Sequence, residues 1–201
     1  FALVDAVNAP QPEPYRSRVA TIMNVEEWMR ILAMERIVGN WDSYGYWRGK
    51  NMYAYKPENG PWVLLPWDID FVFHVGGSGA TDGLFGSNAP LLDRLRDFPE
   101  FQRAYWRAFE DAASGPLKAA TFAARVDKVY NGLAAQGISV ALPQGLKDYA
   151  AARRNYIISQ LATVAASFAV TGPSSFSTNQ NLITVRGTAP VTVARLTVNG
   201  V

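Results

Sequence analysis

The sequence of 201 residues has no cysteine, a single histidine and no long apolar run. Without cysteine the chain has no disulfide, no thiol nucleophile and no zinc site built on thiolates. No stretch approaches the roughly 20 apolar residues that a membrane-spanning helix needs. An excess of one charge is also missing, because 19 basic and 17 acidic residues are spread along the chain and give a net charge of +2. This distribution lacks the basic stripe of a nucleic-acid-binding protein, so we expect no nucleic-acid partner.

Apolar residues are plentiful: 49% of the chain is hydrophobic and 12% is aromatic, which is enough for a sizeable core. The length predicts one domain of ordinary size with a small appendage. Residues 1–23 carry prolines at positions 10, 12 and 14, and we expect an extended lead-in there. Asn24 is a good N-cap and Gly39 a good stop, so the sequence predicts a helix over 25–38.

The middle of the chain reads as a β-hairpin around the turn "ENGP", followed by a glycine-rich loop. Lys50 and Lys56 are expected on the solvated side of this hairpin. From Ala89 to about Ala166 aromatic and aliphatic residues recur at helical spacing, which predicts helices.

After Phe168 the composition changes to valine, threonine, serine and glycine, with alternating runs at 183–185 and 191–193 that predict strands. Two or three strands do not form a stable sandwich by themselves. We therefore expect a first domain over residues 1–167, and over residues 168–201 the truncated start of a β-rich, Ig-like domain.

The segment "PWVLLPWDIDFVFHVGG", residues 61–77, places Asp68 and Asp70 in an otherwise apolar strand. Side chains alternate across a strand, so Val63, Leu65 and the odd-numbered apolar residues up to Phe73 are expected on the buried face and both aspartates on the opposite face. Two neighbouring carboxylates need a compensating charge, which Mg²⁺ supplies. The simpler alternative is a strand end whose aspartates cap a turn or pair with an arginine.

Asp42 and Asn51 flank the loop that precedes the hairpin, and strand pairing brings Asn51 towards the segment with Asp68. Oxygen donors without cysteine or histidine favour Mg²⁺ or Mn²⁺ over zinc. The alternative assigns Asn40 and Asp42 to a helix C-cap and turn, and Asn51 to the start of a strand.

The linked blocks in "GNWDSYGYWRGKNMYAYKPENGPWVLLPWDID" resemble the CotH kinase family, named for spore-coat protein H, over about residues 20–165. The resemblance implies an α+β fold, namely a mostly helical kinase-like C-lobe with a small hairpin that carries the acidic site. It also implies an atypical protein kinase that transfers the γ-phosphate of ATP to serine or threonine of an acceptor protein, using Mg²⁺ or Mn²⁺. Members act in the secreted pathway or at surfaces, so an extracellular, cell-surface or bacterial spore-coat location is expected.

The resemblance assigns roles residue by residue. Asp42 resembles the catalytic aspartate, Asn51 and Asp68 resemble metal ligands, and Asp70 is a further ligand or a neighbour of the ligands. The spacing of nine residues between Asp42 and Asn51 is longer than the five of ordinary kinases. Too few residues precede the first predicted helix for an N-lobe, so the lysine that anchors ATP is expected outside this chain, and the fragment alone is not expected to complete the enzyme.

Three further residues, Asn40, Glu35 and His74, are expected to support the site without contacting the substrate. His74 falls on the aspartate face by alternation. Glu35 lies on the apolar side of its helix and must be hydrogen-bonded or paired. It is expected either to hold the loop from Asn40 to Asp42 or to pair with Arg153 or Arg154.

Two other functions remain open from the residues. The β-rich tail is typical of extracellular multidomain proteins, which favours a non-catalytic surface or adhesion module that keeps the fold and a cation site. Glycoside hydrolysis by paired carboxylates is the third, since Asp68 and Asp70 on one strand face lie about 6–7 Å apart.

Overall fold

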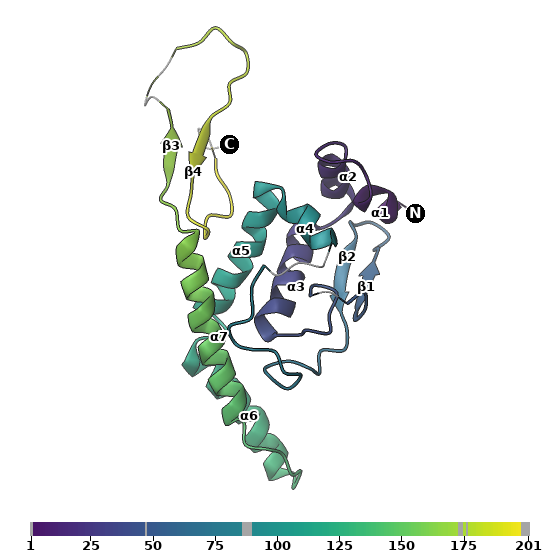
Figure 1. Cartoon of the computed structure of the whole chain (residues 1–201), viewed down its shortest axis with the longest axis vertical. Coiled ribbons are helices and arrows are strands. Elements are labelled where there is room, and N and C mark those ends of the chain that lie inside the picture. The colour runs from purple at the N-terminus through teal and green to yellow at the C-terminus, as the bar shows by residue number, and fades with distance from the viewer. Residues whose placement is uncertain (1, 47, 86–89, 173–174, 176, 198–201) are drawn as a thin grey trace.

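The computed structural model describes residues 2–46, 48–85, 90–172, 175 and 177–197. It is an α+β structure, as the sequence predicts, with helices and two short antiparallel strand pairs (Figure 1). In chain order the elements are α1 (Ala2–Val7), α2 (Tyr15–Ile22), α3 (Val25–Val38), β1 (Met52–Tyr55), β2 (Val63–Pro66), α4 (Pro90–Arg96), α5 (Pro99–Ser114), α6 (Ala119–Ala135), α7 (Gln144–Thr163), β3 (Ala169–Thr171) and β4 (Arg186–Thr188).

The expected extended lead-in is wrong, because α1 and α2 occupy most of the first 22 residues. The prolines lie between the two helices, and Pro14 stands at the N-cap of α2, where the missing N–H group costs no helical hydrogen bond. Tyr15 and Val19 are fully buried in the core. The N-terminal segment is therefore part of the folded domain.

Helix α3 begins and ends where the sequence predicts. The side chain of Asn24 accepts a hydrogen bond from the backbone N–H of Glu27, and Gly39 takes the left-handed conformation (φ 73°) that ends many helices. The helix packs against α5 on one side and against β2 on the other (Figure 1). It is the central element against which the hairpin and the neighbouring loops pack.

The hairpin is confirmed, but its faces are the reverse of the expected ones. Strands β1 and β2 pair antiparallel, with Tyr53 opposite Leu65. Leu64 is 2% exposed and faces the core, whereas Leu65 is 45% exposed. The strand does not run on to Phe73 but ends at Pro66, and beyond it the backbone at Asp68 turns to φ 56°. Because odd-numbered and even-numbered residues of this segment are both apolar, alternation alone does not predict which face is buried.

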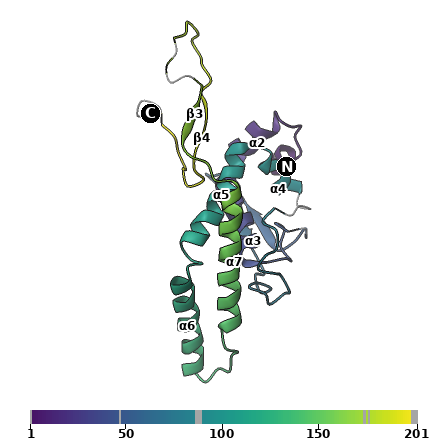
Figure 2. The same ribbon diagram turned by 60° about the vertical axis from the view of Figure 1, so that its left-hand side comes forward.

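Helices α4 to α7 confirm the prediction of helices from Ala89 to about Ala166, although Ala89 itself lies outside the described residues. On α5, Phe101, Tyr105 and Phe109 face the core at helical spacing. Helix α6 buries none of its residues and runs beside one half of α7, so that the two form an arm pointing away from the core (Figure 2).

The C-terminal strands lie at other residues than predicted. Strands β3 and β4 pair antiparallel in a two-stranded ribbon beyond the end of α7 (Figure 1), whereas residues 183–185 and 191–193 lie outside the strands. Arg103 of α5 donates hydrogen bonds to three backbone carbonyl groups within residues 189–193 and so fastens this segment to α5. The division into two domains near residue 167 stays a prediction.

Candidate active site

The turn that follows α3 presents Asp42. The backbone N–H of Asn40 donates to the carbonyl of Glu35 (2.9 Å), and that of Ser43 donates to the carbonyl of Asn40 (3.1 Å). Asn40 is fully buried and Asp42 is 7% exposed. Consecutive backbone hydrogen bonds therefore fix residues 39–43 at the end of the helix.

The structure brings Asp42 and Asn51 into contact. The side-chain amide of Asn51 donates to the Asp42 carboxylate (3.2 Å) and to its backbone carbonyl (3.1 Å). The ammonium group of Lys50 lies 2.7 Å from the same carboxylate oxygen. The Lys50 side chain is 56% exposed, as expected of the solvated side, yet its tip reaches the site. No sequence motif predicts this contact, in which a lysine reaches back to an aspartate eight positions earlier in the chain.

Asp68 and Asp70 lie beyond the end of β2 and are both exposed. The backbone N–H of Trp67 donates to the carbonyl of Asn51 (3.1 Å), so Asp68 directly follows a residue bonded to Asn51. The two aspartates do not share a strand face, since the strand has ended. Among the described residues no three His, Cys, Asp or Glu side chains gather closely enough to hold a metal by themselves. The predicted convergence is thus found for Asp42 and Asn51 but not for a three-carboxylate cluster.

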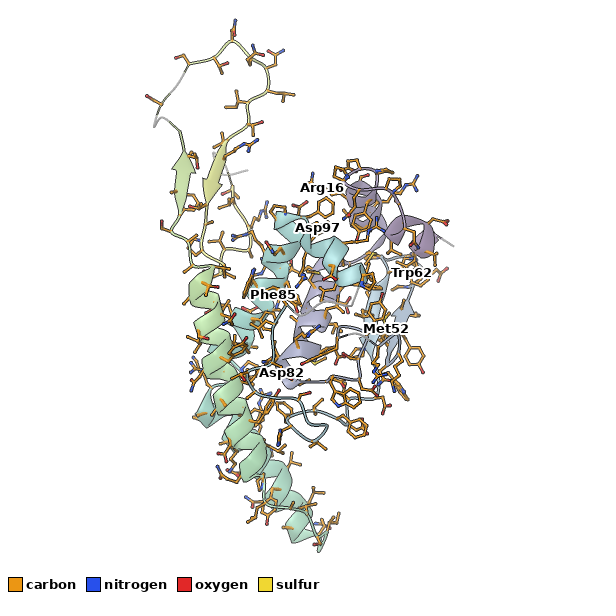
Figure 3. All side chains as sticks on the ribbon, viewed as in Figure 1. Arg16, Met52, Trp62, Asp82, Phe85 and Asp97 are labelled. Atoms are coloured by element: carbon orange, nitrogen blue, oxygen red, sulfur yellow. The ribbon has the colours of Figure 1, made fainter. Side chains whose placement is uncertain are left out.

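The loop after the aspartates returns to the same helix end. The N–H of Phe73 donates to the carbonyl of Val38 (2.7 Å), and the hydroxyl of Ser78 donates to the carbonyl of Gly39 (2.6 Å). In Figure 3, Met52 marks the start of β1, and Asp82 and Phe85 mark the later part of this loop. The turn with Asp42 and the loop with the two aspartates therefore share one anchor, the C-terminal end of α3.

His74 does not lie on a strand face with the aspartates, so that expectation is wrong. Its backbone has φ 79°, its side chain is exposed, and its Nδ1 atom lies 3.3 Å from the carbonyl oxygen of Ser78. The ring contacts the backbone of its own loop.

Glu35 is hydrogen-bonded to the turn that follows α3 and not to Arg153 or Arg154. It is 3% exposed, and its Oε2 atom accepts a hydrogen bond of 2.7 Å from the side-chain amide of Asn40. Burial raises the pKa of the Glu35 carboxyl to about 7, against the opposing effects of the Asn40 and Ser43 side chains. The expected pairing with Arg153 or Arg154 is wrong, since both donate to backbone carbonyl groups elsewhere.

Arg153 of α7 is a residue of the site region whose contacts the sequence did not reveal. It is fully buried and donates to the carbonyl groups of Ala80 and Asp82 in the loop, and to that of Arg36 in α3 (2.6 Å). It thereby ties the loop to the helix end from the side of α7. A contact across 117 residues leaves no local pattern.

The protein is thus a mostly helical domain with a candidate site of acidic side chains. In this site the mostly buried Asp42 contacts the amide of Asn51 and the ammonium group of Lys50, and two exposed aspartates lie just beyond the end of β2. Such oxygen donors and one cation suit the handling of a phosphorylated substrate. The CotH kinase protein family matches residues 1–163, and the chain belongs to this family. The match begins at residue 1, which places α1 and α2 inside the family domain.

No curated protein and no solved structure matches the chain. Family membership indicates a kinase-like function, with the ATP and divalent metal that kinases generally use. Of the described helices, none is long and apolar enough to cross a membrane.

Proposed function

We propose that this protein transfers the γ-phosphate of ATP to a serine or threonine hydroxyl of an extracellular surface or spore-coat protein, with Mg²⁺ or Mn²⁺. The observation that carries the proposal is the contact of Asp42 with Asn51 in a chain that belongs to a kinase family. Phosphoryl transfer requires positioning and charge neutralisation more than covalent help. In this proposal Asp42 positions the acceptor hydroxyl, and the oxygen donors hold the cation that neutralises charge.

The donor set fits a hard divalent cation. Asn51 offers an amide oxygen, and Asp68 and Asp70 are exposed carboxylates on the segment bonded to Asn51. Mg²⁺ usually takes only one or two protein carboxylates and completes its shell with phosphate oxygens and water, so a three-carboxylate cluster is not required. A cation held there would neutralise charge that develops on the transferring phosphoryl group.

Asp42 is the proposed base. Lys50 and Asn51 both contact its Oδ2 atom, which fixes the orientation of the carboxylate at the end of α3. In the reaction the acceptor oxygen forms a bond to the γ-phosphorus while the bond from that phosphorus to the ADP oxygen breaks. The hydroxyl proton passes to Asp42. A positioned base of this kind contributes about 10²–10⁴-fold to the rate.

The test uses the full-length protein with Mg-ATP labelled at the γ-phosphate and a serine-containing acceptor protein. Asp42→Asn and Asp68→Asn are each expected to lower the transfer rate by about 10²-fold or more. Asp127→Asn is the matched control, because Asp127 pairs with Lys147 (2.5 Å) on the arm formed by α6 and α7. Transfer by both site variants at the wild-type rate would show the proposal to be wrong.

The second candidate is the non-catalytic surface module with a cation site. It is favoured by the exposure of Asp68 and Asp70, which leaves both carboxylates accessible to a cation without a nucleotide. Equilibrium dialysis of the full-length protein with ATP, with and without Mg²⁺, separates the two. Absence of metal-dependent ATP binding favours the module over the kinase.

A further inference from the structure

We infer that Glu35 is a positioning residue for Asp42, acting through the side chain of Asn40. The inference rests on the proposed function in so far as Asp42 is the base. Glu35 itself does not contact Asp42, whose carboxylate is bonded to Lys50 and Asn51. Glu35 fixes the position of the turn that carries Asp42, and Asp42 remains the proposed base.

Two hydrogen bonds join Asn40 to Glu35. The side-chain amide of Asn40 donates to Oε2 of Glu35 at 2.7 Å, and the backbone N–H of Asn40 donates to the Glu35 carbonyl at 2.9 Å. Asn40 in turn accepts from the N–H of Ser43. The acceptor for Ser43 is the backbone carbonyl of Asn40, so Asn40 bridges Glu35 and Ser43, and Asp42 lies between these two residues in the chain.

The chain beyond Asp42 packs closely on the same part of α3. A Cβ atom added at Gly45 would lie 3.5 Å from the Cβ of Glu35 and 3.2 Å from the Leu32 side chain, so the backbone at Gly45 packs directly on the helix. The neighbouring Arg36 donates to the Gly45 carbonyl (3.0 Å) and holds it there. The turn with Asp42 is therefore held against α3 at both of its ends, by Glu35 at Asn40 and by Arg36 at Gly45.

The burial of this pair gives the hydrogen bond its importance. Both side chains are almost fully removed from water, Glu35 at 3% and Asn40 at 0% exposure. An unpaired buried amide costs more than an exposed one, because water does not replace the lost acceptor. Removal of the Glu35 acceptor is expected to displace Asn40, and a displacement of about 1 Å at a reacting group reduces a rate by up to about 10²-fold.

The test compares Glu35→Ala with Glu35→Gln in the full-length protein, since glutamine keeps an oxygen that accepts from Asn40. Glu27→Ala is the matched control on the same helix: its Oε2 atom accepts one hydrogen bond, from the N–H of Leu64 (3.1 Å), away from the turn. Two readouts are taken: amide hydrogen exchange of the peptide covering residues 39–45, and the kcat and KM for ATP, each per folded molecule.

Glu35→Ala is expected to speed exchange in residues 39–45 by about tenfold or more and to lower kcat by about 10–100-fold, with KM changed less than about threefold. Glu35→Gln is expected to restore both values, and Glu27→Ala to leave both unchanged. Should Glu35→Ala not fold, Asn40→Ala removes the same hydrogen bond from the side of the turn and is expected to give the same changes.

The inference is overturned if Glu35→Ala or Asn40→Ala lowers the melting temperature while exchange and kcat stay at wild-type values. It is equally overturned if glutamine is as damaging as alanine. A wild-type protein without phosphotransferase activity would instead refute the proposed function. In that case the exchange of residues 39–45 still decides whether Glu35 positions Asp42.

Discussion

Replacement of Glu35 by glutamine is expected to stabilise the protein at alkaline pH and to change its stability little at acid pH. Burial raises the pKa of this carboxyl from its ordinary value of 4.5 to about 7. Between these two values the folded chain keeps a proton that the unfolded chain has released. The free energy of unfolding therefore falls as the pH rises through this window, and above it the whole penalty is present.

The size of the penalty follows from the two pKa values. A rise from 4.5 to about 7, at about 1.4 kcal/mol for each pH unit, corresponds to about 3 kcal/mol above pH 7. Glutamine has nearly the same shape, carries no charge and keeps an acceptor for Asn40. For a chain of this length 1 kcal/mol corresponds to about 2–4 °C, so the melting temperature of the variant is expected to gain about 6–12 °C over wild type on going from acid to alkaline buffer.

The assay is urea unfolding of wild type and Glu35→Gln in a series of buffers from about pH 4 to about pH 8.5. The quantity of interest is the difference between the two free energies of unfolding at each pH, because titrations shared by both proteins cancel. Glu58→Gln, in the exposed hairpin turn, is the control and is expected to show a flat difference. A difference for Glu35→Gln that is equally flat across the series would refute the burial argument.

The remaining predictions concern packing. Leu64→Ala is expected to cost about 2–5 kcal/mol in urea unfolding and the neighbouring Leu65→Ala under about 1 kcal/mol, because Leu64 is 2% and Leu65 45% exposed; equal costs would show the assigned faces to be wrong. Gly39→Ala is expected to cost more than about 1 kcal/mol, since φ is 73° and the new Cβ would meet a tyrosine hydroxyl at 2.4 Å. Gly132→Ala, with open space around it inside α6, is expected to raise stability by about 0.5–1 kcal/mol. Arg103→Ala is expected to speed limited proteolysis of residues 189–193 without lowering the melting temperature of the core. An unchanged cleavage rate would show that the hydrogen bonds from Arg103 do not hold this segment against α5.

Features that depend on local chemistry could be predicted from the sequence. Asn24 and Gly39 bound α3 because an N-cap and a left-handed glycine act within one helical turn. The hairpin follows from the turn "ENGP" between two β-prone segments, and the family blocks follow from short motifs. Strand pairing predicts that Asn51 lies near the segment with Asp68, and the N–H of Trp67, the residue before Asp68, donates to the carbonyl of Asn51.

Features that depend on what packs against a segment could not be predicted. The buried face of β2 is chosen by α3, whose Glu27 accepts from the N–H of Leu64. The proline-rich start of the chain was expected to be extended because the prolines were counted as helix breakers. They in fact lie between α1 and α2, which bury Tyr15 and Val19. Alternation likewise fails beyond Pro66, where the strand ends and the aspartates leave any common face.

The shared anchor at the end of α3 has a consequence for regulation. A partner that shifts this helix is expected to move the turn with Asp42 together with residues 73–78 of the loop, because both are hydrogen-bonded to the end of the helix. Such a movement is expected to change the spacing between this turn and these loop residues little. We therefore expect the activity to be controlled by occlusion of the exposed aspartates or by delivery of the nucleotide, and not by opening and closing within this domain.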